Sequence, residues 1–293
     1  MRLTTGSLSK TEKRAREEHY SGFSATEITK TFVRSTMLYK WNITIPQLTG
    51  AFERAAYVYV PDWYEEGSDE RFPVLYMFDA HNVFLDEDAT YGKSWGTLEH
   101  LEENRVPLIV AGAACNPFPE DSEVGGRLSE YAPFSFDGGG WGKIKGRGKI
   151  TMDWLTKEFK PYVDENFPTL PERRYTFIAG SSMGGLMTIY ALMRYNKFFS
   201  RGAALSPSVE FAPEKVLKLI ERARIRKTHL YMDMGEREFK WMDGPGHFAE
   251  TAAALINKGV LLECRTVPRG KHNEASWEKQ IPFFMDLLFY DLQ

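Results

Sequence analysis

The sequence contains few cysteines, and their number limits the classes of protein to which it can belong. Among 293 residues there are two, Cys115 and Cys264. Two distant thiols exclude a disulfide framework, and their spacing matches no metal motif, although a single bridge between them stays open. We expect two buried thiols in a reducing environment. The cysteine content therefore predicts a cytoplasmic protein.

Long apolar runs and an excess of charge of either sign are also absent. No stretch approaches the roughly 20 apolar residues that cross a bilayer, and residues 1–20 contain no apolar segment of signal-peptide length. The net charge is −3, which gives no reason to expect nucleic acid or an anionic membrane as a partner. No pattern indicates an oligomeric state. We expect a soluble globular protein.

Strand-like and helix-like stretches alternate from residue 29 onward, after a polar extension over residues 1–28. Stretches rich in β-branched and aromatic residues come first, as in half-exposed antiparallel strands, at 29–35, 40–46 and 54–61. Apolar runs typical of buried parallel strands follow at 72–78, 106–113, 175–180, 201–207, 228–235 and 260–267. Helical patterns separate them. This order predicts one α/β domain over residues 29–293, with a mostly parallel central sheet, antiparallel N-terminal strands and helices on both faces.

One segment, residues 116–148, shows neither pattern. It contains three prolines and many glycines. Loops of this length are uncommon in compact domains unless they are functional. We expect the segment to form a wall of an active-site cleft.

The stretch Gly180-Ser181-Ser182-Met183-Gly184 lies between a strand-like run and a helix-like run. Gly-x-Ser-x-Gly at such a junction is typical of a nucleophile elbow, a sharp turn that exposes the serine hydroxyl. The flanking glycines keep Cβ atoms out of the crowded turn. The next helix directs its N-terminal amides at the serine, so we expect the Met183 amide to stabilise an oxyanion. The pattern predicts that Ser182 is a nucleophile.

A serine nucleophile needs a base, which is usually a histidine on a loop. The histidines that follow Ser182 are His229, His247 and His272. His229 begins a predicted strand and His247 begins a predicted helix. His272 comes directly after the last predicted strand, in a glycine-containing loop before the final helix. We therefore expect His272 to be the base.

The remaining parts of a serine hydrolase site are an acid and a second oxyanion donor. The acid should lie between the serine and the histidine, after a strand. Glu236 and Glu238 both fall in the loop that follows Gly235. Spacing alone leaves the choice between them open. The second donor is expected from the loop after the strand at 72–78, at the backbone amide of His81.

Four short stretches stand out for their combination of residues: Val74–Asn82, Arg127–Tyr131, Gly180–Gly185 and Gly270–Trp277. Together they resemble a family of α/β hydrolases that includes esterase D, enterochelin esterases, feruloyl and acetylxylan esterases and the mycobacterial mycolyltransferases. The resemblance covers about residues 30–290. It implies the α/β-hydrolase fold and ester hydrolysis through an acyl-enzyme, with no metal and no organic cofactor. It also implies that the acid is Glu238, where the family often has Asp.

The resemblance extends to candidate substrate contacts. Asp79, Asn82 and Arg127 lie within the matching stretches, and Trp95 and Tyr131 are rings that suit stacking on a sugar or aryl group. The resemblance implies a small-molecule or oligosaccharide ester as substrate, and we expect an acetyl or feruloyl ester of a carbohydrate. Alternatives are an enterochelin-type siderophore, a thioester like S-formylglutathione, or acyl transfer to an acceptor.

Overall fold

The computed structural model of the chain describes residues 29–33, 36–240 and 245–292. The expected extension over residues 1–28 lies outside the described residues. Within the described residues, no helix combines the length and the hydropathy needed to span a bilayer.

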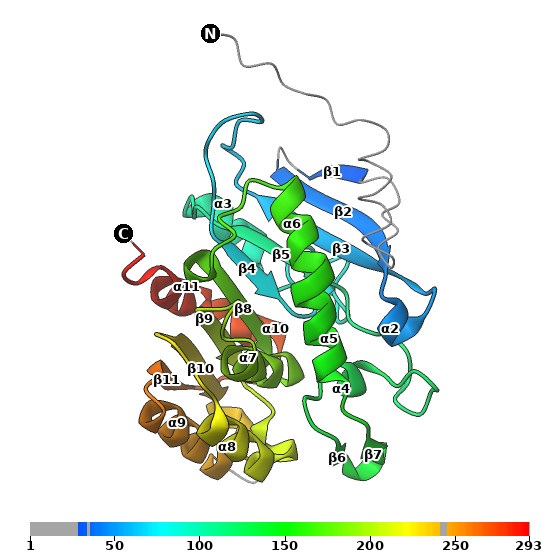
Figure 1. Ribbon diagram of the computed structural model, residues 1–293, viewed down its shortest axis with the longest axis vertical. Coiled ribbons are helices and arrows are strands. Elements are labelled where there is room, and N and C mark those ends of the chain that lie inside the picture. The colour runs from blue at the N-terminus through cyan, green and yellow to red at the C-terminus, as the bar shows by residue number, and fades with distance from the viewer. Residues whose placement is uncertain (1–28, 34–35, 241–244, 293) are drawn as a thin grey trace.

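A nine-stranded sheet forms the centre of the molecule (Figure 1). Its strands are β1 (Thr29–Val33), β2 (Thr36–Thr44), β3 (Glu53–Val60), β4 (Val74–Met77), β5 (Ile109–Ala113), β8 (Thr176–Ser181), β9 (Arg201–Leu205), β10 (His229–Gly235) and β11 (Leu261–Val267). They lie in the order β1-β2-β3-β5-β4-β8-β9-β10-β11. The pairs from β1 to β5 are antiparallel, and all pairs from β5 to β11 are parallel. The predicted α/β sheet with antiparallel N-terminal strands is confirmed.

The order of the central strands creates a switch point at β4. The chain leaves β4 for β5 on one side and returns through β8 on the other side. In open α/β sheets a crevice forms outside the carboxyl ends of the strands where the winding reverses. Both β4 and β8 are buried along their whole length, as their continuous apolar runs predict. The crevice therefore opens just beyond Met77 and Ser181.

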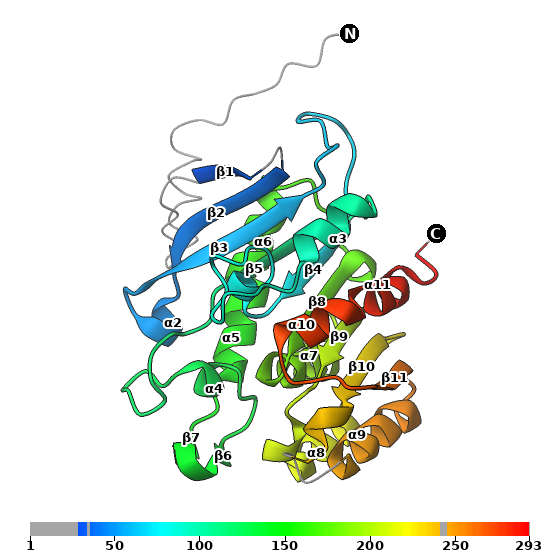
Figure 2. The ribbon, with the colours of Figure 1, turned by 180° about the vertical axis from the view of Figure 1, so that it is seen from behind.

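Helices cover both faces of the sheet (Figures 1 and 2). One face carries α5 (Gly148–Trp154), α6 (Lys160–Asn166), α7 (Met183–Arg194), α8 (Pro213–Arg222) and α9 (Gly246–Asn257), and the other carries α3 (Thr97–Glu103), α10 (Glu274–Trp277) and α11 (Ile281–Phe289). The short helix α2 spans Pro46–Thr49. A π-helical turn, Leu155–Phe159, joins α5 to α6. A 3-10 turn at Glu278–Gln280 separates α10 from α11, and Pro282 lies in the first turn of α11, where proline suits a helix start.

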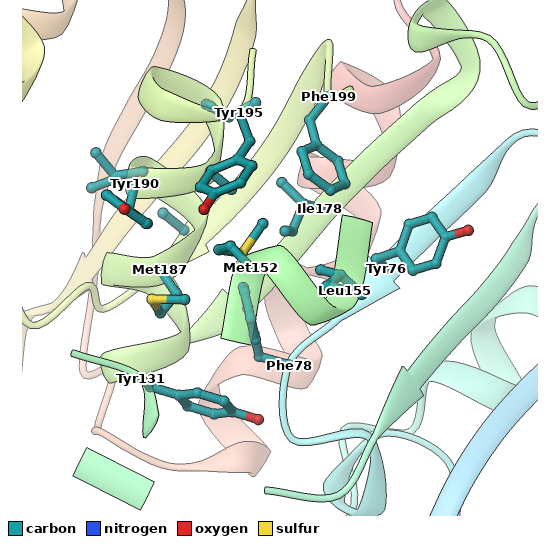
Figure 3. Close-up of a cluster of buried hydrophobic side chains, with 14 of the residues drawn as sticks. Tyr76, Phe78, Tyr131, Met152, Leu155, Ile178, Met187, Tyr190, Tyr195 and Phe199 are labelled. Carbon is teal, nitrogen blue, oxygen red and sulfur yellow. The ribbon is translucent and has the colours of Figure 1, made fainter. Parts of the chain in front are cut away.

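Aromatic rings pack between the sheet and the helices of the first face (Figure 3). The Tyr76 ring centroid lies 6.3 Å from that of Phe199, and the Phe78 centroid lies 5.1 Å from that of Tyr131. Figure 3 shows Tyr131 at one end of this cluster. Burial of each such side chain contributes on the order of 2 kcal/mol. The packing fixes the Tyr131 ring beside the crevice.

The segment 116–148 contains more structure than its sequence indicates. It includes the helix α4 (Arg127–Glu130) and a hairpin of β6 (Phe136–Asp137) and β7 (Lys143–Ile144). A buried ion pair ties α4 to β3, with Arg54 Nη1 2.8 Å from Glu130 Oε2. Of the whole segment, residues 116–120 and Arg127 line the crevice. The expectation that it walls the cleft therefore holds only for this part.

The two cysteines are both free. Cys115 is half-buried, whereas Cys264 is exposed. The prediction of two buried thiols is therefore wrong for Cys264. The reason is its place on β11, the last strand of the sheet, whose side chains are incompletely covered.

Candidate active site

The predicted elbow lies where β8 meets α7. Ser182 is the single residue between them, and its backbone is left-handed, with φ 59° and ψ −123°. Such a conformation costs on the order of 1–3 kcal/mol for a residue with a Cβ and is found mainly at functional sites. The turn is also crowded, because a Cβ added at Gly180 would lie 2.8 Å from the carbonyl carbon of Gly184. Glycine is thus required at position 180 by close backbone contact.

Hydrogen bonds fasten the elbow to the segment that follows β9. The amide of Ser182 donates to the Leu205 carbonyl at 2.9 Å, and the amide of Ser208 donates to the Ser182 carbonyl at 3.1 Å. The Ser182 hydroxyl lies 3.3 Å from the Ser208 hydroxyl. Ser208, which the sequence did not single out, therefore holds both the backbone and the side chain of the predicted nucleophile.

The structure brings His272 and Glu238 together. His272 Nδ1 lies 2.7 Å from Glu238 Oε2, and the Glu238 side chain is buried. Glu236, the other acid left open by the sequence, faces elsewhere and accepts a hydrogen bond from the Arg269 amide at 2.7 Å. Of the two acids, Glu238 is the one placed to orient the imidazole.

Two further residues hold this acid–base pair. The second Glu238 oxygen, Oε1, accepts hydrogen bonds from the Ser206 hydroxyl at 2.7 Å and from the Gly235 amide at 2.9 Å. Trp277 Nε1 donates to the Ser206 hydroxyl at 3.0 Å, and the Trp277 ring packs edge-on against His272. Trp277 therefore supports both members of the pair. It lies in one of the stretches that carry the family resemblance, but no pattern in the sequence indicated this contact.

Backbone amides at the N-terminus of α7 and in the loop after β4 are free to bind an oxyanion. Met183 is the first residue of α7, so its amide has no acceptor within the helix. After β4 the chain turns through Asp79, which has φ 55°. The Asp79 amide donates to the Tyr131 hydroxyl at 3.1 Å. In the described part of the chain the next two amides, of Ala80 and His81, donate to no protein acceptor.

The loop after β4 is held by an ion pair. Arg127 donates from Nε and Nη2 to the two carboxylate oxygens of Asp79, at 2.8 and 2.7 Å. Burial opposes ionisation of Asp79, but Arg127 outweighs it and lowers the pKa of this carboxyl. Together with the hydroxyl of Tyr131, this pair fixes the position of the candidate oxyanion loop.

Asp79, His81 and Cys115 bring three potential metal-ligand atoms within 4.8 Å of one another. Both Asp79 oxygens are already bound by Arg127. Burial raises the pKa of the Cys115 thiol, which disfavours the thiolate that binds metals. These residues fit the ion-paired loop better than a metal site.

A cavity of about 1200 Å³ opens over the elbow. Ser182 and His272 line it, as do His81 and the predicted contacts Asp79, Asn82 and Arg127. The other two predicted contacts do not. Trp95 is buried against Trp277, with ring centroids 5.7 Å apart, and Tyr131 is buried in the core below the loop. Each instead contacts a residue that lines the cavity: Trp95 contacts Trp277, and Tyr131 accepts the hydrogen bond of the Asp79 amide.

A model of the family described as "Putative esterase" matches residues 51–285. The chain belongs to this family. It is an esterase of the α/β-hydrolase fold. The uncharacterized protein YbbA of Bacillus subtilis (strain 168) is 23% identical over 184 residues, which are 62% of this chain and 67% of YbbA.

Solved structures of several esterases resemble this one. The siderophore hydrolase EstA from Aspergillus nidulans has a TM-score of 0.68 and 18% identity, over 90% of this chain and all of EstA. A ferulic acid esterase has a TM-score of 0.59 and 19% identity, over 87% and 97%. An S-formylglutathione hydrolase from Agrobacterium tumefaciens has a TM-score of 0.60 and 16% identity, over 91% and 99%. At these identities the likeness shows the fold alone.

One more carboxyl of this esterase lies close to the acid–base pair. Glu210 follows Ser208 in the 3-10 turn Val209–Phe211, and both of its carboxyl oxygens are buried without a hydrogen-bond partner in the described residues. Burial raises the pKa of Glu210 to about 7, although its own backbone amide and the charge of His272 act in the opposite direction. Neighbouring Glu238 raises the pKa further and His247 lowers it. The ionised form is therefore costly in the folded protein.

Glu210→Gln should stabilise the fold more at about pH 8.5 than at about pH 5. The folded-state pKa of about 7 exceeds the ordinary glutamate value of 4.5, so wild type loses stability as the pH rises between these values. The loss of unfolding free energy in wild type is on the order of 3 kcal/mol. The variant should not show it, because glutamine does not ionise. Denaturant unfolding of both proteins at both pH values measures it. If the variant and wild type differ in unfolding free energy by the same amount at both pH values, the raised pKa of Glu210 is contradicted.

Proposed function

We propose that the protein hydrolyses carboxylic esters through an acyl-enzyme on Ser182. The hydrogen bond between His272 Nδ1 and Glu238 Oε2, in the cavity that Ser182 also lines, carries this proposal. When Nδ1–H donates to Glu238, Nε2 of the neutral imidazole is unprotonated and can accept a proton. The 3.3 Å contact of the Ser182 hydroxyl with Ser208 is long for an O–H···O bond, so its loss on rotation toward His272 costs little.

In the proposed reaction, the Ser182 oxygen attacks the ester carbonyl carbon while its proton passes to His272. The carbonyl oxygen becomes an oxyanion, which the amides of Met183 and His81 stabilise. The bond to the leaving oxygen then breaks, and His272 returns the proton to the departing alkoxide. Water then attacks the carbonyl carbon of the acyl-enzyme while its proton passes to His272. The bond to the Ser182 oxygen breaks, His272 returns the proton to Ser182, and the carboxylic acid leaves. Glu238 remains ionised and stabilises the imidazolium.

The size and the lining of the cavity favour a bulky substrate with a flat ring. Phe52 and Tyr91 line it with exposed fractions of 40% and 81%, and Phe118 packs edge-on against Phe52 at 4.9 Å. Exposed rings of this kind stack on aryl groups and on the apolar faces of sugars. Arg127 and Asn82 offer polar groups near the nucleophile. These features support an acetyl or feruloyl ester of a carbohydrate as the substrate class.

A panel of esters tests this proposal. We expect kcat/KM for feruloyl or acetyl oligosaccharides to exceed that for S-formylglutathione by about tenfold or more, because the latter has no ring to stack. A catechol siderophore ester belongs in the panel, since the same rings can stack on catechols and EstA is a siderophore hydrolase. The highest kcat/KM on S-formylglutathione would contradict the proposed substrate class. Addition of an acceptor sugar during turnover would reveal acyl transfer as a new ester product.

A further inference from the structure

A second cavity lies between α7 and α8, which are neighbours on one face of the sheet (Figures 1 and 2). Its volume is about 670 Å³. The walls come from the C-terminal half of α7, from α8 and the residues after it, and from Pro133 and Phe134. It shares no lining residue with the catalytic cavity. Because a helix rises 1.5 Å per residue, Arg194 at the far end of α7 lies roughly 17 Å from the elbow.

Cations dominate the charged groups of this groove. Among the described residues that line it, none is acidic and five are basic: Arg194, Lys215, Lys218, Arg222 and Arg224. The net charge of the whole chain is −3, so the concentration of positive charge is local. On α8, Lys215, Lys218 and Arg222 recur at spacings of three and four, which places them on one helix face. Glu214 and Glu221 lie on the same helix but do not line the groove.

Protein groups do not neutralise these cations. Lys215 Nζ donates to the Ser135 carbonyl at 2.6 Å. Within the residues that the structure describes, the side chains of the other four form no ion pair and no hydrogen bond (Arg194, Lys218, Arg222, Arg224). Unpaired cations around a concavity produce a focused positive potential, which attracts anions. All five side chains are exposed, so an anionic ligand would replace water as their partner.

The groove also has an apolar side. Phe134, Tyr190, Met193 and Leu219 line it, and the rings of Phe134 and Tyr190 pack edge to face at 6.2 Å. The volume lies within the range typical of small-molecule sites. Arginine guanidinium groups bind phosphate and carboxylate alike with two parallel hydrogen bonds. A phosphate group carries more negative charge than a carboxylate, which favours phosphate where several cations converge. We propose that this groove binds a small molecule with two or more phosphate groups and a flat apolar ring.

Calorimetric titration of the full chain tests this site, with ADP, tripolyphosphate and adenosine as probes. Wild type should bind ADP most tightly, tripolyphosphate more weakly and adenosine not measurably. Lys218→Ala combined with Arg222→Ala removes two unpaired cations and should weaken ADP binding by about tenfold. Neither residue lines the cavity over the elbow, so ester turnover should be unchanged in this variant. Unchanged turnover also shows that the variant folds.

Arg71→Ala combined with Lys279→Ala is the matched control, because it removes two exposed cations outside the groove. Its ADP affinity should equal that of wild type. Absence of ADP binding by wild type at low salt would overturn the proposal. An equal loss of affinity in the control would also overturn it, since it would show only general charge attraction. Tighter binding of hexaglutamate than of ADP would overturn it in favour of an acidic protein partner.

Discussion

Ser182→Ala is expected to lower kcat by at least about 10⁴-fold while the protein remains folded. The variant lacks the oxygen that would attack the ester, so the residual rate can come only from the oxyanion amides and from substrate binding. The fold should be retained because the hydroxyl makes one long contact, with Ser208 at 3.3 Å. Measurement of turnover on a small ester, together with thermal unfolding, checks both statements.

Ser181→Ala is the matched control for this prediction. Ser181 is adjacent to Ser182, lines the same cavity and carries the same hydroxyl, but it is the last residue of β8 and is mostly buried. Its loss should change kcat by less than about threefold. A fluorophosphonate probe should label the Ser181→Ala variant and fail to label Ser182→Ala. Labelling of Ser182→Ala, or retention of more than a few per cent of its turnover, would exclude Ser182 as the nucleophile.

The fold could be predicted because its elements leave strong local patterns. Each of the nine central strands corresponds to a stretch of β-branched, aromatic or apolar residues, and each is long enough to show that pattern. The elements inside 116–148 could not be predicted in this way. The strands β6 and β7 have two residues each, and tertiary contacts hold their surroundings, such as those of Arg147 with the Gln47 carbonyl at 2.7 Å and of Lys215 with Ser135. Such contacts leave no periodicity.

Some residues of the candidate site could likewise be predicted from the sequence, and others could not. Chain order placed Ser182 and His272 in one cavity, because both follow strands whose carboxyl ends meet at one edge of the sheet. The supporting residues Ser206 and Ser208 were missed, since their hydrogen bonds join separate strands and follow no local spacing. Trp95 was misjudged as a substrate contact because sequence does not reveal which rings are exposed.

The choice between Glu236 and Glu238 could not be made from spacing because it depends on a single turn. Both residues lie in the 3-10 turn Glu236–Glu238, where each residue advances by a third of a turn. Their side chains therefore point in different directions, one to the Arg269 amide and the other to His272. The family resemblance placed the acid at Glu238, and the contact with His272 lies there.

Glu238→Gln is expected to lower kcat by about 10³–10⁴-fold. The Gly235 amide and the Ser206 hydroxyl both donate to Oε1, so the glutamine carbonyl oxygen should take this position and its NH₂ group should face His272 Nδ1. Nδ1 must then accept a hydrogen bond, which moves the ring proton to Nε2. An imidazole protonated at Nε2 is unable to accept the proton of Ser182. The large loss thus follows from the wrong tautomer in an almost unchanged structure.

Glu236→Gln distinguishes this mechanism from a general effect of charge. It removes the same charge two residues away and leaves an oxygen for the Arg269 amide, so kcat should fall by less than about threefold. The pH dependence of kcat/KM provides a second readout. Wild type and Glu236→Gln should share one pH profile, and the residual activity of Glu238→Gln should depart from it. Equal losses in the two variants would show that neither acid orients His272 and would exclude the proposed triad.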